Sequence, residues 1–175
     1  QRTLPGPVLY CGLEDSEARL QTRLRLLLRG KETPEGLSFR TALPRLDNGG
    51  LEWLAGWIID NRPRLVILDT WAKVKGDSKK GLNAYESDYQ LVGPLKALAD
   101  RTGTAIVLIH HLRKHASRDG SEDIESLSGS MGLPGAADGL LFLKRDQGAD
   151  AATLARQGRD LEEDDDILLA WTAPG

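Results

Sequence analysis

Three apolar stretches of the chain end in pairs of polar residues that could bind or act on phosphate groups. The pairs are Glu14-Asp15, Asp69-Thr70 and His110-His111. Ligands of open parallel sheets bind at the carboxyl ends of the strands, so side chains at these points can share one site. Carboxylates there could bind Mg²⁺ or activate water, and imidazoles could contact phosphate oxygens.

Asp69 is the candidate for metal binding. It follows the apolar run at residues 65–68, where an ion bound to a nucleotide needs an oxygen ligand, directly or through water. Thr70 beside it is a candidate for contacting the same nucleotide. Strands also end in Asp because this residue caps turns, so one such residue does not by itself identify a metal site.

Glu14 is the candidate base. A glutamate beside the metal site could orient or deprotonate the water that attacks ATP. Alternatively, Glu14, Asp15 and Glu17 only complement the positive end of the helix that follows them.

His110 and His111 could contact the γ-phosphate of a nucleotide or report its loss to the following loop. A metal ion shared by the two imidazoles is not expected, because consecutive residues of a strand face opposite sides.

The elements that position these residues alternate between short apolar runs and longer amphipathic segments, which predicts an α/β fold with a mostly parallel sheet covered by helices on both faces. Expected strands occupy residues 8–13, 37–41, 65–69 and 105–109. Expected helices occupy residues 16–29, 51–61 and 86–102. Ser16 could cap the first helix, and its apolar face is expected to hold Leu20, Leu24, Leu27 and Leu28.

The last part of the chain has a different pattern. Residues 139–145, 152–157 and 167–172 predict three short antiparallel strands separated by acidic and glycine-bearing turns. We expect one domain over residues 1–175, with residues 139–175 as an antiparallel extension of it.

Composition limits the class of protein. A net charge of −3 and a pI near 5.7 argue against a protein that coats nucleic acid over its whole surface, so any such contact must be local. The lone Cys11 cannot form an internal disulfide, and no apolar stretch approaches the roughly 20 residues that span a bilayer. A cytoplasmic location without membrane contact is expected.

Three strings together resemble a known family. Val-Leu-Tyr-Cys-Gly-Leu-Glu-Asp-Ser, Leu-Val-Ile-Leu-Asp-Thr and Ile-Val-Leu-Ile-His-His are similar to the core of RepA-type plasmid replicative helicases and related RecA-like AAA-family ATPases. The resemblance covers residues 7–159 and implies a RecA-like three-layer sandwich with ATP and Mg²⁺ as cofactors. It also implies that Asp69 is the Walker B aspartate, Glu14 the catalytic glutamate, and His110 with His111 the γ-phosphate sensor.

One part of the family pattern is missing. The Gly-x-x-x-x-Gly-Lys-Ser/Thr loop that cradles the triphosphate does not occur in this sequence. The early position of Glu14 and the start at Gln1 favour an N-terminally truncated chain, with the loop roughly 20–50 residues upstream. The alternative is a protein that does not bind ATP in the usual way. We expect the fragment alone not to hydrolyse ATP.

The resemblance also implies a homo-oligomeric, hexameric ring whose sites are completed by a basic residue of the neighbouring subunit. RepA-type enzymes carry an arginine where this chain has Ser128. The segment around Arg156 and Arg159 resembles the one from which DnaB-type helicases project trans-acting basic residues, with Lys144 and Arg145 as weaker candidates. These charges could instead only protect an exposed strand edge.

Single-stranded DNA is the expected partner of two loops that face the central channel in RecA-like rings, at residues 73–80 and 111–130. The candidate DNA-binding residues are Lys73, Lys75, Lys79, Lys80, Arg113 and Lys114. Charged loops are often only solvated. The expected function is therefore an ATP-hydrolysing, ring-forming DNA helicase of plasmid or phage replication. The alternatives are a RecA-like regulatory or recombination ATPase and a noncatalytic interaction module without a phosphate loop.

Overall fold

The computed structural model describes residues 4–76, 84–111, 135–145, 148–158 and 166–170. Its first sheet is parallel and has the order β2-β1-β3-β4. These strands are β1 (Val8–Gly12), β2 (Leu37–Arg40), β3 (Leu65–Asp69) and β4 (Ala105–Ile109). Each lies within a range predicted from the apolar runs, so the predicted α/β class is confirmed.

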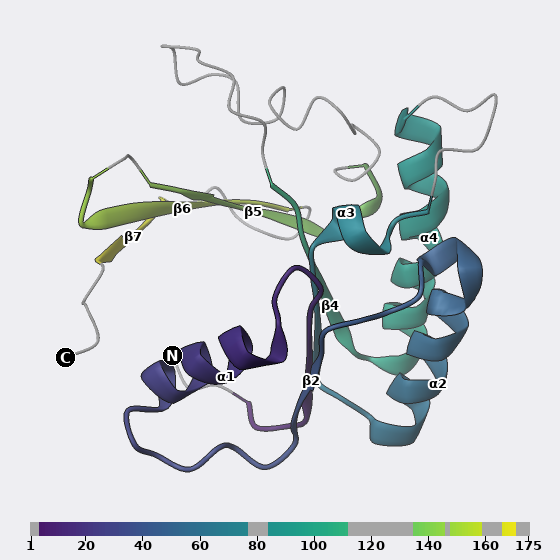
Figure 1. The fold of residues 1–175 in the computed structure, drawn as a ribbon. Coiled ribbons are helices and arrows are strands. Elements are labelled where there is room, and N and C mark those ends of the chain that lie inside the picture. The colour runs from purple at the N-terminus through teal and green to yellow at the C-terminus, as the bar shows by residue number, and fades with distance from the viewer. Residues whose placement is uncertain (1–3, 77–83, 112–134, 146–147, 159–165, 171–175) are drawn as a thin grey trace.

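Helices cover both faces of the parallel sheet, as Figure 1 shows. Helix α1 (Glu17–Leu28) lies on one face, and α2 (Leu51–Asn61) and α4 (Ala84–Thr102) lie together on the other. No helix among the described residues is long and apolar enough to cross a membrane.

The hydrophobic core lies between the sheet and the two helices α2 and α4. Alternate residues of a strand face the same side, so one face of β1 and β3 is entirely buried against these helices. The fully buried side chains on this face include Leu9, Cys11, Val66 and Leu68, and they pack in one cluster with Leu54, Ile58, Val92, Leu95 and Leu98. Burial raises the pKa of the Cys11 thiol to about 11, because the thiolate would lose its water.

Helix α1 begins as the sequence predicts but packs more narrowly. The Ser16 hydroxyl accepts a hydrogen bond from the Arg19 backbone N–H, at 3.4 Å, and so caps the helix. Leu20 is buried, but the prediction that Leu27 shares its face is wrong, since Leu27 is 79% exposed. The i,i+4 series from Leu20 to Leu28 is the face that turns toward the sheet.

The segment after β3 also differs from the prediction. The sequence predicts a loop from residue 73 onward, but Trp71–Val74 forms a short helix, α3, and Lys73 lies in it. Trp71 and Val74 are fully buried and hold this turn against the core. Before α2, a distorted helical turn, η1 (Leu46–Gly50), leads into that helix.

The C-terminal strands form a separate antiparallel sheet with the order β5-β6-β7, as the alternating pattern predicts. Its strands are β5 (Gly139–Lys144), β6 (Ala151–Gly158) and β7 (Ile167–Ala170). The Lys96 ammonium on α4 lies 2.8 Å from the Asp138 carboxylate, which connects the start of β5 to the helical layer.

Candidate active site

The register of the parallel sheet brings the three predicted polar pairs to one edge. Gly12 lies opposite Asp69, and Asp69 lies opposite Ile109, so β1, β3 and β4 end at the same level. The chain therefore leaves these strands with Glu14, Thr70 and His110 close to a common edge, which is where open α/β sheets bind ligands.

Glu14 is fixed to the end of β3. The Thr70 hydroxyl donates a hydrogen bond to Glu14 Oε1 at 3.1 Å, and the Leu13 N–H donates to the Asp69 carbonyl oxygen at 2.6 Å. Thr70 is only 1% exposed, so its side chain has little freedom to leave this contact. The glutamate thus lies beside the candidate metal-binding strand, while about 45% of its side-chain surface stays open to solvent.

Asp69 has a partner that sequence reasoning missed. The Tyr10 hydroxyl donates a hydrogen bond of 2.5 Å to Asp69 Oδ2. Burial, followed by the hydrogen bond to Asp69, raises the pKa of Tyr10 to about 12, so the phenol is protonated near neutral pH. A tyrosine two residues before Gly12 on the same strand face was the available signal, because aromatic side chains can reach diagonal neighbours across a sheet.

The two histidines separate. His111 Nε2 lies 3.8 Å from Glu14 Oε2, on the open side of the site. The His110 Nδ1 atom is buried without a hydrogen-bond partner. Burial lowers the pKa of His110, nearby Lys75 lowers it further, and Asp88 raises it. His111 therefore faces the candidate base, whereas His110 belongs to a second group of charges.

That second group is a half-buried ion pair behind the strand ends. Lys75 Nζ lies 3.8 Å from Asp88 Oδ1, and Asp88 is only 2% exposed. The other carboxylate oxygen, Oδ2, has no hydrogen-bond partner. Asp88 lies in the middle of a polar stretch of the sequence and gave no signal that it would be buried.

The donor set fits only part of a metal site. Among the described residues, no group of three or more His, Cys, Asp or Glu side chains could hold an ion. Mg²⁺ at nucleotide sites often uses one or two carboxylates together with phosphates and water, and Asp69 matches that protein share. Asp15 is not a second ligand candidate, because it pairs with Arg19 at 3.3 Å and with Arg23.

The predicted basic residues lie in several places. Lys73 is exposed on α3, and Lys75 is the partner of Asp88. Arg156 lies on β6 opposite Leu141, and Arg145 donates from Nε to the Ala149 carbonyl oxygen at 2.8 Å. The remaining ones, with Ser128, lie outside the described residues, and they are Lys79, Lys80, Arg113, Lys114 and Arg159.

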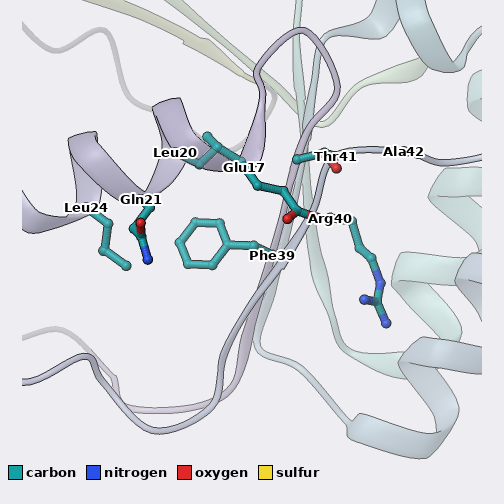
Figure 2. A pocket seen from close by; sticks show the side chains of 8 residues that line it. All are labelled: Glu17, Leu20, Gln21, Leu24, Phe39, Arg40, Thr41 and Ala42. Atoms are coloured by element: carbon teal, nitrogen blue, oxygen red, sulfur yellow. The ribbon is translucent and has the colours of Figure 1, made fainter.

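A groove between α1 and β2 is separate from this site. It has a volume of about 510 Å³, and Figure 2 shows Phe39 projecting from β2 toward Gln21 and Leu24 of the helix. Arg40 points away from the helix in the same view, and its guanidinium lies 5.8 Å from the ring centre of Trp53. The residues that line the groove do not include Glu14, Asp69 or Thr70.

A comparison with protein families identifies the sheet that carries these strand ends. The family model described as AAA domain matches residues 1–117, which include β1 to β4 and all three polar pairs. The chain belongs to the AAA domain family. Membership implies that this AAA domain binds a nucleotide, and the open edge with Glu14 and Asp69 is where the fold would place one.

Solved structures show that this AAA domain has a RecA-like fold. One of them, an isolated ATPase domain, superimposes with a TM-score of 0.72 and 13% identity, covering 96% of this chain and 72% of that one. A DnaB-like replicative helicase, solved in a study of its interactions with primase, gives a TM-score of 0.73 and 14% identity. The AAA domain spans half of that chain, and 96% of its own residues are covered.

Proposed function

We propose that this AAA domain is the ATP-binding and ATP-hydrolysing core of a ring-forming DNA helicase of plasmid or phage replication. The observation that carries the proposal is the hydrogen bond from Thr70 to Glu14, which holds a partly open carboxylate beside Asp69 at the carboxyl edge of the sheet. The likeness to a solved ATPase domain and to a DnaB-like replicative helicase supports the choice of motor.

Glu14 acts on the attacking water in this proposal. One oxygen of its carboxylate accepts a hydrogen bond from Thr70, so the side chain is oriented before substrate arrives. The other oxygen, Oε2, faces His111 and solvent, and it is available to accept a hydrogen bond from water. His111 is then placed to respond when the γ-phosphate leaves, since it follows β4 closely and approaches the same glutamate.

Asp69 is the residue that would hold Mg²⁺, directly or through water, with Thr70 beside it. The ion supplies positive charge to the phosphate oxygens as the bond to the γ-phosphate breaks. The protein's part is to fix the carboxylate at the strand end. Tyr10 and the backbone contact between Leu13 and Asp69 do this from the neighbouring strand.

The phosphate-binding loop comes from residues outside this sequence in the proposal. Among the described residues β4 has one strand neighbour, β3, and Val107 in the middle of β4 is 38% exposed. Strands of parallel sheets are normally covered on both faces, and an open apolar edge favours pairing with a further strand. A strand that carries a Gly-x-x-x-x-Gly-Lys-Ser/Thr loop could pair there and direct the loop toward Asp69 and Glu14.

Ring assembly and DNA binding extend the proposal. A basic residue of the β6 segment, Arg156 or Arg159, would complete the site of the neighbouring subunit. Single-stranded DNA would contact the segments that follow β3 and β4, through Lys73, Lys75, Lys79, Lys80, Arg113 and Lys114.

The test is nucleotide-driven unwinding by the natural full-length protein. Mg²⁺-dependent ATP hydrolysis that single-stranded DNA stimulates, together with strand separation of a forked duplex, would support the helicase. Hydrolysis without strand separation would instead indicate a regulatory or recombination ATPase. A full-length protein with no affinity for ATP would exclude both and leave the noncatalytic module.

A further inference from the structure

Tyr10 reaches Asp69 along a diagonal of the parallel sheet. In the register of β1 and β3, Tyr10 lies opposite Ile67, and Gly12 lies opposite Asp69. Tyr10 and Gly12 are two residues apart and so share one face of β1. The phenol ring must therefore extend over Gly12 toward the carboxyl edge before its hydroxyl can meet Asp69 Oδ2 at 2.5 Å.

Gly12 provides the space for this arrangement. A Cβ atom at Gly12 would lie 2.8 Å from Cε1 of Tyr10 and 3.1 Å from a methyl carbon of Leu20. Carbon atoms do not approach that closely without displacement, so any side chain here would push the Tyr10 ring from its place. The glycine is thus required by the path of the ring across the strand.

The ring is also held from the other neighbouring strand. Phe39 on β2 lies opposite Tyr10 in the register, and the two rings meet edge to face with their centroids 6.0 Å apart. Such a pair favours one ring orientation over others. Three neighbours, Gly12, Leu20 and Phe39, thereby fix where the Tyr10 hydroxyl lies.

We propose that Tyr10 is a positioning residue for the metal-binding carboxylate, in which its hydroxyl binds Asp69 Oδ2 and leaves Oδ1 for the ion that accompanies the nucleotide. Hydrogen bonds from such outer partners set the orientation of a ligating carboxylate, and their loss typically costs about 10-fold to 100-fold in metal affinity. Because this role rests on the proposed function, its test must separate the two.

The experiment measures Mn²⁺ binding to the full-length protein by electron paramagnetic resonance, in the presence of a non-hydrolysable ATP analogue. Tyr10→Phe keeps the ring and removes the hydroxyl, and we expect it to weaken Mn²⁺ binding by about 10-fold or more. Affinity for the analogue without metal should not change. Tyr89→Phe on α4, which removes a hydroxyl elsewhere, is the matched control and should bind Mn²⁺ like the wild type.

Gly12→Ala gives a second, independent variant. It keeps the phenol but displaces the ring, so the same loss of Mn²⁺ affinity is expected even if Tyr10→Phe does not fold. A lower thermal midpoint with unchanged Mn²⁺ affinity in either variant would mean a purely structural role and would overturn the inference alone. If the wild-type protein itself binds no Mn²⁺ with the analogue, the proposed function falls as well.

Discussion

The Thr70 hydroxyl and the Glu14 carboxylate are 56 positions apart in the sequence and lie 3.1 Å apart in the fold. The contact joins the ends of β1 and β3, and its donor is buried while its acceptor is partly open to solvent. A carboxylate held in this way is oriented but still accessible to water, which is the combination that a catalytic base needs.

Replacing Thr70 by Val tests this contact. The change keeps the branched shape and removes the donor, so we expect the full-length protein to lose about 10-fold in kcat for ATP, since hydrogen bonds to charged groups contribute about 1.5–3 kcal/mol. Stability should fall by less than about 1 kcal/mol, because Glu14 is open enough to regain water. Steady-state kinetics and urea unfolding measure the two effects.

Thr22→Val is the control for that substitution. The Thr22 hydroxyl donates to the Ala18 carbonyl oxygen on the exposed side of α1, away from the site residues. A Thr70→Val protein with the kcat of Thr22→Val would show that the hydrogen bond does not orient the base.

The raised pKa of Tyr10 predicts a pH dependence of stability. Its value of about 12 in the folded protein exceeds the ordinary 10, so the folded state retains a proton that the unfolded chain releases. The associated stabilisation is complete below pH 10 and is lost as the pH rises from 10 to 12. Urea unfolding at about pH 9, 10 and 11 should show this loss, and Tyr10→Phe should remove part of it. Tyrosinate absorbance that assigns Tyr10 its ordinary pKa would contradict the expectation.

The pair of Lys75 and Asp88 predicts an energetic coupling. Lys75→Ala would leave the Asp88 carboxylate buried without its cation, and we expect a loss of about 1–3 kcal/mol in the free energy of unfolding. In Lys75→Ala/Asp88→Asn the second change should cost less than it does alone, which a double-mutant cycle measures. Lys73→Ala on the exposed side of α3 is the control, with an expected change within about 0.5 kcal/mol. Strictly additive effects would argue against the pair.

DNA binding by the segment after β3 can be determined from its salt dependence. Replacing Lys73, Lys75, Lys79 and Lys80 by Ala should weaken binding to single-stranded DNA. It should also lower the slope of log affinity against log salt by roughly 0.7 for each phosphate that the protein no longer binds. Fluorescence anisotropy at several salt concentrations measures the slope. An unchanged slope would place the DNA elsewhere.

The sequence predicted the parallel sheet because each strand is a short apolar run bounded by polar, Gly or Pro residues, such as Pro63 before β3 and Gly103 before β4. It also predicted which polar pairs would meet, since parallel strands end at a common edge. It did not predict α3, because a segment rich in Lys and Gly is typical of a loop. There, burial of Trp71 outweighs local composition.

The contacts within the site were harder to predict. The bond between Tyr10 and Asp69 depends on the diagonal register of two strands and on the space at Gly12, neither of which a single strand reveals. The sequence predicts that His110 and His111 act together. Their separation follows from the alternation of side chains at a strand end, which sends one toward Glu14 and leaves the other near Lys75 and Asp88.

The most direct test of the central claim is single-turnover ATP hydrolysis by the full-length protein with Glu14→Gln, alongside equilibrium binding of ATP. The amide keeps the size of the side chain and its contact with Thr70 but cannot accept a proton from water. We therefore expect ATP affinity within about twofold of the wild type and hydrolysis slower by about 100-fold or more. Hydrolysis at the wild-type rate would contradict the assignment of Glu14 as the catalytic base.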